Sequence, residues 1–151
     1  MSRRALLLLL CAALCCAPAC NAVSLQRRYV ERRLRAEAIH DHTLDLPSGR
    51  LRFYSGGAGS PVLLVHGFGF SAVETWRHQL VALSRDHTVF APDIYWFGGS
   101  APRDRAAMDT AAQQADGLVE LLDRLGLGRV DVVGVSFGGF IALQLALRHP
   151  E

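Results

Sequence analysis

The sequence predicts an α/β fold: a mainly parallel β-sheet with helices on both faces, preceded by an antiparallel hairpin at one edge. Three continuous apolar runs, each typical of a strand buried on both faces, alternate with segments of helical periodicity. This β-α-β-α-β-α order implies right-handed crossovers and parallel pairing. The chain has 151 residues, 50% of them hydrophobic, which is enough for one domain at most.

The chain begins with a predicted export signal, residues 1–19. Arg3 and Arg4 form a basic region, residues 5–17 are apolar, and Ala17-Pro18-Ala19 is a cleavage site of small residues. The apolar run is too short for an ordinary membrane-spanning helix, which needs about 20 residues. We therefore expect an exported protein.

Cys20 directly follows this cleavage site. The arrangement resembles the lipobox of bacterial lipoproteins, although Ala17 stands where that motif usually has Leu. The resemblance implies lipidation of Cys20 and a membrane as the partner of the N-terminal anchor. A secreted or periplasmic protein, or an uncleaved anchor, is the alternative.

Cysteine and charge exclude several classes of function. All four cysteines lie in or beside the export signal, so the rest of the chain has no disulfide and no thiolate metal site. The net charge is +2, with 16 basic and 14 acidic residues, and no concentrated basic patch indicates a nucleic-acid partner. No metal or organic cofactor is expected.

Residues 20–38 are predicted to form a basic stalk or linker helix. Five arginines are spread over residues 27–35, and apolar residues recur at three- to five-residue spacing from Leu25 to Ala38. Two interpretations stay open. The helix could lie on anionic lipid headgroups, or it could be solvated and pack its apolar stripe on the domain.

Residues 39–151 are expected to form the N-terminal, incomplete part of the α/β domain. Residues 39–46 and 50–54 predict a hairpin around the turn Pro47-Ser48-Gly49. Buried parallel strands are predicted at 61–66, 87–91 and 130–135. Helices are predicted at 72–84, 105–125 and 137–148.

The run Gly134-Val135-Ser136-Phe137-Gly138-Gly139 carries the clearest chemical signal. It fits the pattern G-x-S-x-G, with a predicted buried strand before it and a predicted helix after it. A sharp turn here would hold the Ser136 hydroxyl above the sheet edge. The backbone N–H of Phe137 would point from a helix N-terminus, where the dipole favours an anion.

Two further motifs accompany this turn in the expected order. His66-Gly67-Phe68-Gly69 follows the first buried strand, and Ala91-Pro92-Asp93, continuing to Gly98-Gly99-Ser100, follows the second. With the serine turn, they resemble the α/β-hydrolase superfamily, in its branch of esterases, carbon–carbon bond hydrolases and cofactor-free haloperoxidases. The resemblance covers roughly residues 45–151 and implies the N-terminal portion of that fold. Tyr95-Trp96 departs from the usual pattern.

The resemblance implies a serine hydrolase. Ser136 would be the nucleophile, and the backbone N–H groups of Phe68 and Phe137 would form the oxyanion hole. A serine here excludes the branch members with an aspartate nucleophile, the haloalkane dehalogenases and epoxide hydrolases. The expected substrate is a small-molecule ester or related acyl compound, cleaved through an acyl-enzyme. The alternatives are a haloperoxidase-like or carbon–carbon bond hydrolase, or a non-catalytic binding protein derived from a hydrolase.

The acid and the histidine of such a triad follow the serine in chain order. His149 and Glu151 lie at the far end of the predicted helix, about 18 Å from Ser136. His66 and Asp93 are expected to hold loops rather than to react. We therefore expect the sequence to be the N-terminal part of a longer chain, and to be inactive alone.

Overall fold

The computed structural model describes residues 25, 26, 28–104, 106–108 and 110–150. The predicted signal peptide and Cys20 lie outside these residues. The chain divides into two units, residues 1–33 and residues 34–151. In the first unit, residues 25, 26 and 28–33 are helical. No helix in the described ranges has both the length and the apolar character needed to cross a membrane.

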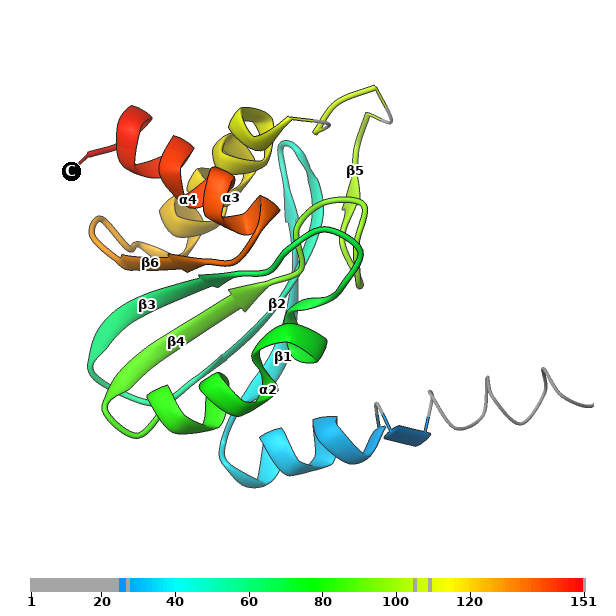
Figure 1. Ribbon diagram of the computed structural model, residues 1–151, viewed down its shortest axis with the longest axis vertical. Helices are drawn as coiled ribbons and strands as arrows, with labels where there is room; N and C mark the ends of the chain where they lie inside the picture. The colour runs from blue at the N-terminus through cyan, green and yellow to red at the C-terminus, as the bar shows by residue number, and fades with distance from the viewer. Residues whose placement is uncertain (1–24, 27, 105, 109, 151) are drawn as a thin grey trace, which may run out of the picture. The chain divides into compact units, whose positions relative to one another are not determined.

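The second unit is built on a mixed sheet (Figure 1). The strand order is β1 (His40–Leu46), β2 (Gly49–Gly56), β4 (His87–Pro92), β3 (Ser60–Val65) and β6 (Asp131–Gly134), with the short β5 (Ala101–Pro102) also paired to β2. β1 and β2 form the predicted antiparallel hairpin, and β3 pairs in parallel with both β4 and β6. The mixed α/β architecture predicted from the sequence is confirmed.

Successive side chains along the central strands point to opposite faces of the sheet and are buried against different helices. Leu63 and Val65 of β3 belong to one continuous core, together with Leu118 and Leu121 of α3 (Ala111–Leu125) and Ile141 of α4 (Phe137–Arg148). Val62 and Leu64 of the same strand are also buried but lie outside that core, because successive side chains point to opposite faces. Helices α3 and α4 therefore cover one face, and α2 (Ala72–Leu83) covers the other (Figure 1).

Capping residues set the helix starts. Ser71 and Glu74 form a capping box at the start of α2, and Thr110 and Gln113 form another at the start of α3. The predicted start of α3 at residue 105 is therefore wrong, because the chain turns at Asp104 and helical structure begins only after Thr110.

The prediction that the third parallel strand is buried on both faces is also wrong. β6 lies at the end of the strand order and pairs with β3 alone in the described sheet. As a result, Val133 is 44% exposed. The apolar run predicted the strand correctly, but composition does not reveal a strand's place in the sheet.

Polar side chains tie the hairpin to its surroundings. Ser48 donates to the Glu120 carboxylate at 2.6 Å and lies 2.6 Å from the Tyr95 hydroxyl. Since Ser48 has one hydroxyl proton, Tyr95 must be the donor to it. Burial raises the pKa of Tyr95, which keeps that hydroxyl protonated. The turn of the hairpin is thereby fixed to α3 and to the loop after β4.

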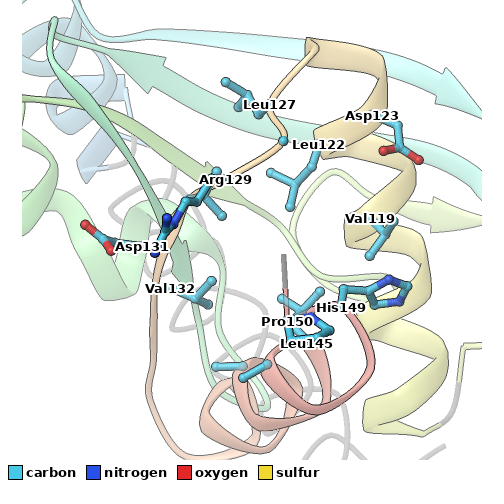
Figure 2. Close-up of a pocket in the computed structure, with 14 residues that line it drawn as sticks. Val119, Leu122, Asp123, Leu127, Arg129, Asp131, Val132, Leu145, His149 and Pro150 are labelled. Carbon is cyan, nitrogen blue, oxygen red and sulfur yellow. The ribbon is translucent and has the colours of Figure 1, made fainter.

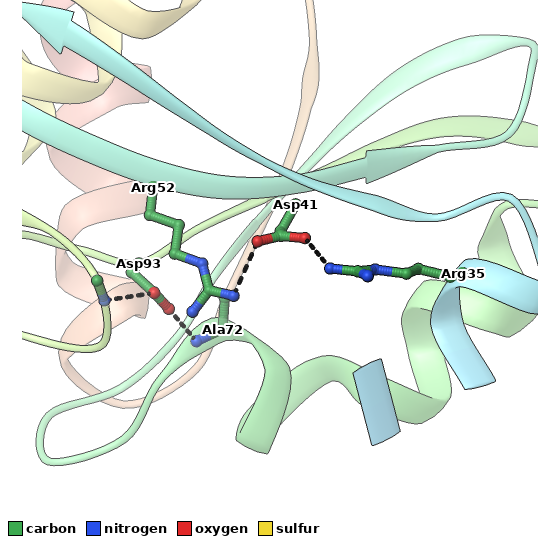
Figure 3. A network of polar contacts seen from close by, with 6 residues as sticks. Arg35, Asp41, Arg52, Ala72 and Asp93 are labelled. Carbon is green, nitrogen blue, oxygen red and sulfur yellow. Dashed lines mark hydrogen bonds and ion pairs between the residues drawn. The ribbon is translucent and has the colours of Figure 1, made fainter. Parts of the chain in front are cut away.

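A second link joins the first residues of this unit to β2. Asp41 accepts from Arg35 and from Arg52, each at 3.2 Å, and the Arg52 guanidinium lies 4.9 Å from the centre of the Tyr54 ring. Figure 3 shows Asp41 between the two guanidinium groups. Burial opposes the charge on Asp41, but the two arginines outweigh it and lower its pKa.

Candidate active site

The candidate site lies where three parallel strands end. The carboxyl ends of β3, β4 and β6 are adjacent in the sheet, and the motifs at 66–69, 93–100 and 134–139 follow them directly. In open α/β sheets this edge is where ligands bind. The fold therefore brings together the three motifs that are separate in the sequence.

Ser136 occupies a strained turn between β6 and α4. Its backbone angles are φ 54° and ψ −122°, a region that favours glycine. Glycines make the turn possible, because a Cβ on Gly134 would lie 2.2 Å from the Gly138 carbonyl oxygen, and one on Gly138 would lie 2.2 Å from that of Val65. Strand and helix thus approach more closely than any side chain would permit.

The Ser136 side chain is exposed and sits beside the loop after β3. A Cβ placed on Gly67 would lie 3.2 Å from the Ser136 Cβ and 3.8 Å from its Oγ. Among the described residues, no side chain or backbone group hydrogen-bonds the Ser136 hydroxyl. The hydroxyl is therefore open to an incoming group.

Two backbone N–H groups belong to residues beside Ser136, one in the loop after β3 and one in the next residue of the chain. Phe68 follows Gly67, which packs on Ser136, and Phe137 is the first residue of α4. Within the described part of the chain, neither N–H donates to a protein acceptor. The N–H of Phe137 also lies at the positive end of the helix dipole. These groups have the chemistry needed to bind a negatively charged oxygen.

His66 is fully buried and holds the loop after β3. Its Nδ1 lies 2.7 Å from the Gly67 carbonyl oxygen, and its Nε2 accepts from the Ile94 N–H at 3.0 Å. A carbonyl can only accept, so Nδ1 carries the proton and the ring is neutral. Burial lowers the pKa of His66, in agreement with this arrangement. Both ring nitrogens therefore have backbone partners, and neither is bonded to Ser136.

Asp93 is also fully buried and joins two loops. One carboxylate oxygen accepts from the Ala72 N–H at 2.7 Å (Figure 3). The other accepts from the Gly99 N–H at 2.8 Å. Its carboxylate therefore caps the start of α2 while fixing the loop after β4. As expected from the sequence, Asp93 holds loops.

Gln114 has a comparable role that the sequence analysis missed. It is buried in α3, accepts from the Tyr95 N–H at 2.9 Å and donates to the Met108 carbonyl at 2.6 Å. A polar residue on the otherwise apolar face of the predicted helix was the available signal. Gln114 anchors the backbone of the loop after β4 to α3.

Aromatic rings lie against one another across the three motifs. Phe68 and Phe97 make an edge-to-face contact with ring centres 5.0 Å apart, Phe68 and Phe137 make another at 6.4 Å, and His66 and Phe97 a third at 6.0 Å. The Phe68 ring nevertheless remains 71% exposed. The sequence placed these aromatic residues together at the motif loops, as the lining of an apolar acyl pocket or as ordinary core packing, and the structure adds which rings touch.

A cavity lies away from Ser136, at the other end of α4. It measures about 550 Å³ and is bounded by α3, the segment leading into β6 and the end of α4 (Figure 2). Figure 2 shows His149 and Pro150 at this cavity, beside Leu145 and Val119. His149 is thus at the opposite end of α4 from Ser136, as predicted. Within the described ranges, no cluster of His, Cys, Asp or Glu could hold a metal ion.

Known proteins are similar to the part of the chain that carries these motifs. A model of the alpha/beta hydrolase fold family matches residues 60–151. The chain is 40% identical over 104 residues to a 2-hydroxymuconate semialdehyde hydrolase of Pseudomonas sp., covering 68% of the chain and 36% of the relative. It is 43% identical over 97 residues to a 2-hydroxy-6-oxo-2,4-heptadienoate hydrolase of Pseudomonas putida, covering 63% and 35%. The chain thus spans about a third of the length of these relatives.

Solved structures are similar over the same region and beyond it. A putative epoxide hydrolase from Pseudomonas aeruginosa superposes with a TM-score of 0.70 at 31% identity, over 74% of this chain and 38% of the other. A membrane phospholipase A, described as a bacterial virulence factor, superposes with a TM-score of 0.76 at 28% identity. That match covers 96% of this chain and 46% of the phospholipase chain.

Proposed function

The chain belongs to the α/β-hydrolase family, and from this premise we propose that its protein is a serine hydrolase that cleaves an ester or related acyl bond. The observation that carries the proposal is the state of Ser136. Its backbone is strained, its hydroxyl is exposed and without a partner in the described chain, and it packs on the loop that carries the N–H of Phe68. Strain of this kind is characteristic of reactive positions.

The proposed reaction begins with attack of the Ser136 Oγ on the substrate carbonyl carbon. The carbonyl oxygen becomes negatively charged and is bound by the N–H groups of Phe68 and Phe137. The serine proton passes to a general base and then to the leaving alcohol, and water hydrolyses the acyl-enzyme. In enzymes of this fold, the base and its orienting acid follow the serine in chain order.

We propose a lipid-like ester as the substrate and a membrane as the place of action. Support comes from the likeness to the membrane phospholipase A, which extends over 96% of this chain. The N-terminal apolar run and Cys20 point in the same direction, since export and lipidation would tether the domain beside its substrate. A secreted or periplasmic enzyme is the alternative.

The test is covalent labelling of the full-length gene product with a fluorophosphonate, which reacts with an activated serine. We expect one labelled peptide containing Ser136, and no labelling of Ser136→Ala. The matched control is Ser60→Ala, since Ser60 is exposed at the start of β3 and should not affect labelling. An unlabelled wild-type protein that folds normally would favour a non-catalytic binding protein instead.

A second candidate is a hydrolase of carbon–carbon bonds. It is favoured by the 40% and 43% identical relatives, whose names give unsaturated oxo compounds as substrates. Hydrolysis at a ketone carbon of such a compound breaks a carbon–carbon bond, and the same two N–H groups would bind the developing oxyanion. Turnover of 2-hydroxy-6-oxo-2,4-heptadienoate, but not of p-nitrophenyl esters, would establish this candidate over the ester hydrolase. A haloperoxidase-like activity would instead require peroxide-dependent halogenation by the same protein.

A further inference from the structure

We infer that the exposed ring of Phe68, supported from behind by Phe97 and Phe137, is the surface that receives an uncharged, apolar acyl group of the substrate. The inference rests on the proposed function and adds the chemical class of the acyl group and the residue that selects it. Phe68 then contributes to the site twice: its backbone N–H faces the oxyanion, and its side chain contacts the acyl chain.

The position of Phe68 is the first argument. It follows Gly67 directly, and Gly67 packs so closely on Ser136 that an added Cβ would lie 3.2 Å from the serine Cβ. An acyl group attached to the Ser136 Oγ would therefore lie beside this loop. Phe68 is the first residue of the loop after Gly67 and carries a large apolar side chain.

Exposure of the ring is the second argument. Phe68 is 71% exposed, although a large apolar side chain is normally buried. It is not an isolated surface residue, because its ring contacts Phe97 at 5.0 Å and Phe137 at 6.4 Å between centres. Those two rings are partly buried and pack on the main core. An apolar surface that is both exposed and backed by the core is typical of a binding site.

Rigidity is the third argument. The loop that carries Phe97 is fixed by Asp93 through Gly99 and by Gln114 through Tyr95, and the Phe97 N–H donates to the Ile94 carbonyl at 3.1 Å. The Phe97 ring also contacts the buried His66 at 6.0 Å. The aromatic surface is therefore formed before the substrate arrives, which lowers the entropy cost of binding.

Charge gives the fourth argument. The three motifs, residues 66–69, 93–100 and 134–139, contain no lysine or arginine. The ionisable side chains of these motifs are already hydrogen-bonded within the protein. His66 and Asp93 are fully buried and bonded to backbone groups, and the Tyr95 hydroxyl is hydrogen-bonded to Ser48. These loops therefore offer an acyl group an apolar ring and backbone N–H groups, with no cation for a carboxylate.

The test compares p-nitrophenyl octanoate with p-nitrophenyl acetate in the full-length protein. The measured quantity is the ratio of kcat/KM for the two esters. We expect the wild type to favour octanoate, and Phe68→Ala to lower the ratio about tenfold through the loss of apolar contact area. Phe97→Ala, which removes the support, should lower it in the same direction by about threefold.

The matched control is Phe70→Ala. Phe70 lies in the same loop and is 61% exposed, but none of the described rings contacts it. It should leave the ratio within about twofold of wild type. If Phe68→Ala does not fold, Phe68→Leu replaces it, because Leu is apolar but lacks the ring; a ratio about threefold below wild type is then expected.

The outcomes separate the two proposals. An unchanged ratio in Phe68→Ala or Phe68→Leu, with fluorophosphonate labelling of Ser136 retained, would overturn the inference and leave the serine hydrolase standing. An equal loss for both esters in Phe68→Ala also overturns it, because that is the result of general damage. No labelling and no turnover of either ester by the wild type would overturn both proposals.

Discussion

The loops after β3 and β4 differ from the turn after β6 in how they use their polar side chains. His66 and Asp93, which belong to the first two, are fully buried and give every polar atom a backbone partner. Ser136, in the third, is exposed, has strained backbone angles and has no partner for its hydroxyl in the described chain. The same sheet edge thus carries two residues committed to structure and one available for reaction.

We therefore expect substitutions in the two kinds of region to have different effects, on stability in one and on activity in the other. Substitution of the satisfied residues should destabilise the fold, because it leaves buried backbone groups without partners. Substitution of the unsatisfied residue should affect chemistry and leave the fold intact or more stable.

Ser136→Ala should abolish hydrolysis by the full-length protein while leaving its stability close to wild type. Loss of the nucleophile in a serine triad lowers kcat by on the order of 10⁶. Ser136→Gly should be equally inactive but more stable than Ser136→Ala by about 1 kcal/mol, because glycine relieves the strain at φ 54°. Kinetics and urea unfolding measure the two effects. A Ser136→Ala protein that kept its activity would exclude Ser136 as the nucleophile.

Asp93→Ala should lower the free energy of unfolding by about 2–5 kcal/mol, because the N–H groups of Ala72 and Gly99 lose their acceptors. Asp93→Asn should also destabilise, since its amide nitrogen would face one of these donors. The control is Asp86→Ala at an exposed turn, for which we expect a change within about 0.5 kcal/mol. Equal stability of the Asp93 and Asp86 variants in urea unfolding would refute the structural role of Asp93.

His66 should make stability fall in mildly acidic solution. Burial lowers its pKa in the folded protein, so the unfolded chain takes up the proton first. The stabilisation of the folded state by neutral His66 is fully present above the ordinary histidine pKa of about 6.5. It is lost as the pH falls from there through the lower pKa that His66 has in the folded protein. Unfolding of His66→Gln, followed over this range, should show a weaker pH dependence than wild type. The exposed His78 provides the control variant, His78→Gln, which should keep the wild-type slope.

The smallest effect is expected at Asp41, in the exposed pairing with Arg35 and Arg52. Asp41→Asn should cost about 0.5 kcal/mol, because solvent screens these charges. The lowered pKa of Asp41 makes its contribution present above the unfolded pKa of about 3.9 and lost as pH falls below it. Thermal unfolding at low and high salt measures the effect. Destabilisation as large as that of Asp93→Ala would show that the pairing is part of the core structure.

Most of the fold could be predicted from local patterns. The hairpin, the first two parallel strands and the helix after Ser136 all occur where alternation, apolar runs and the Pro150 stop indicate them. The predicted start of α3 was wrong because the residues before Thr110 continue the helical pattern of the sequence without being helical. The capping pair Thr110 and Gln113 was a readable signal for the true start.

The remaining differences depend on tertiary structure. β5 has two residues, Ala101 and Pro102, and forms because the first residues of β2 offer it a partner, which no local pattern encodes. The exposure of β6 follows from its place at the end of the strand order. For the candidate site, motif order indicated that Phe68, Asp93 and Ser136 would converge. The edge-to-face packing of Phe68 on Phe97 depends on how two loops lie together, so only the structure revealed it.

The parallel pairing of β6 with β3 has a consequence for synthesis on the ribosome. Val65 pairs with Gly134, whereas the β1–β2 hairpin joins neighbours in the chain. Contacts between distant residues form late, because a long loop must close first. The hairpin and the β3–β4 pair can therefore assemble in the nascent chain before β6 leaves the exit tunnel. The constrained turn at Ser136 would then be completed late in folding, onto a framework that already holds its neighbours.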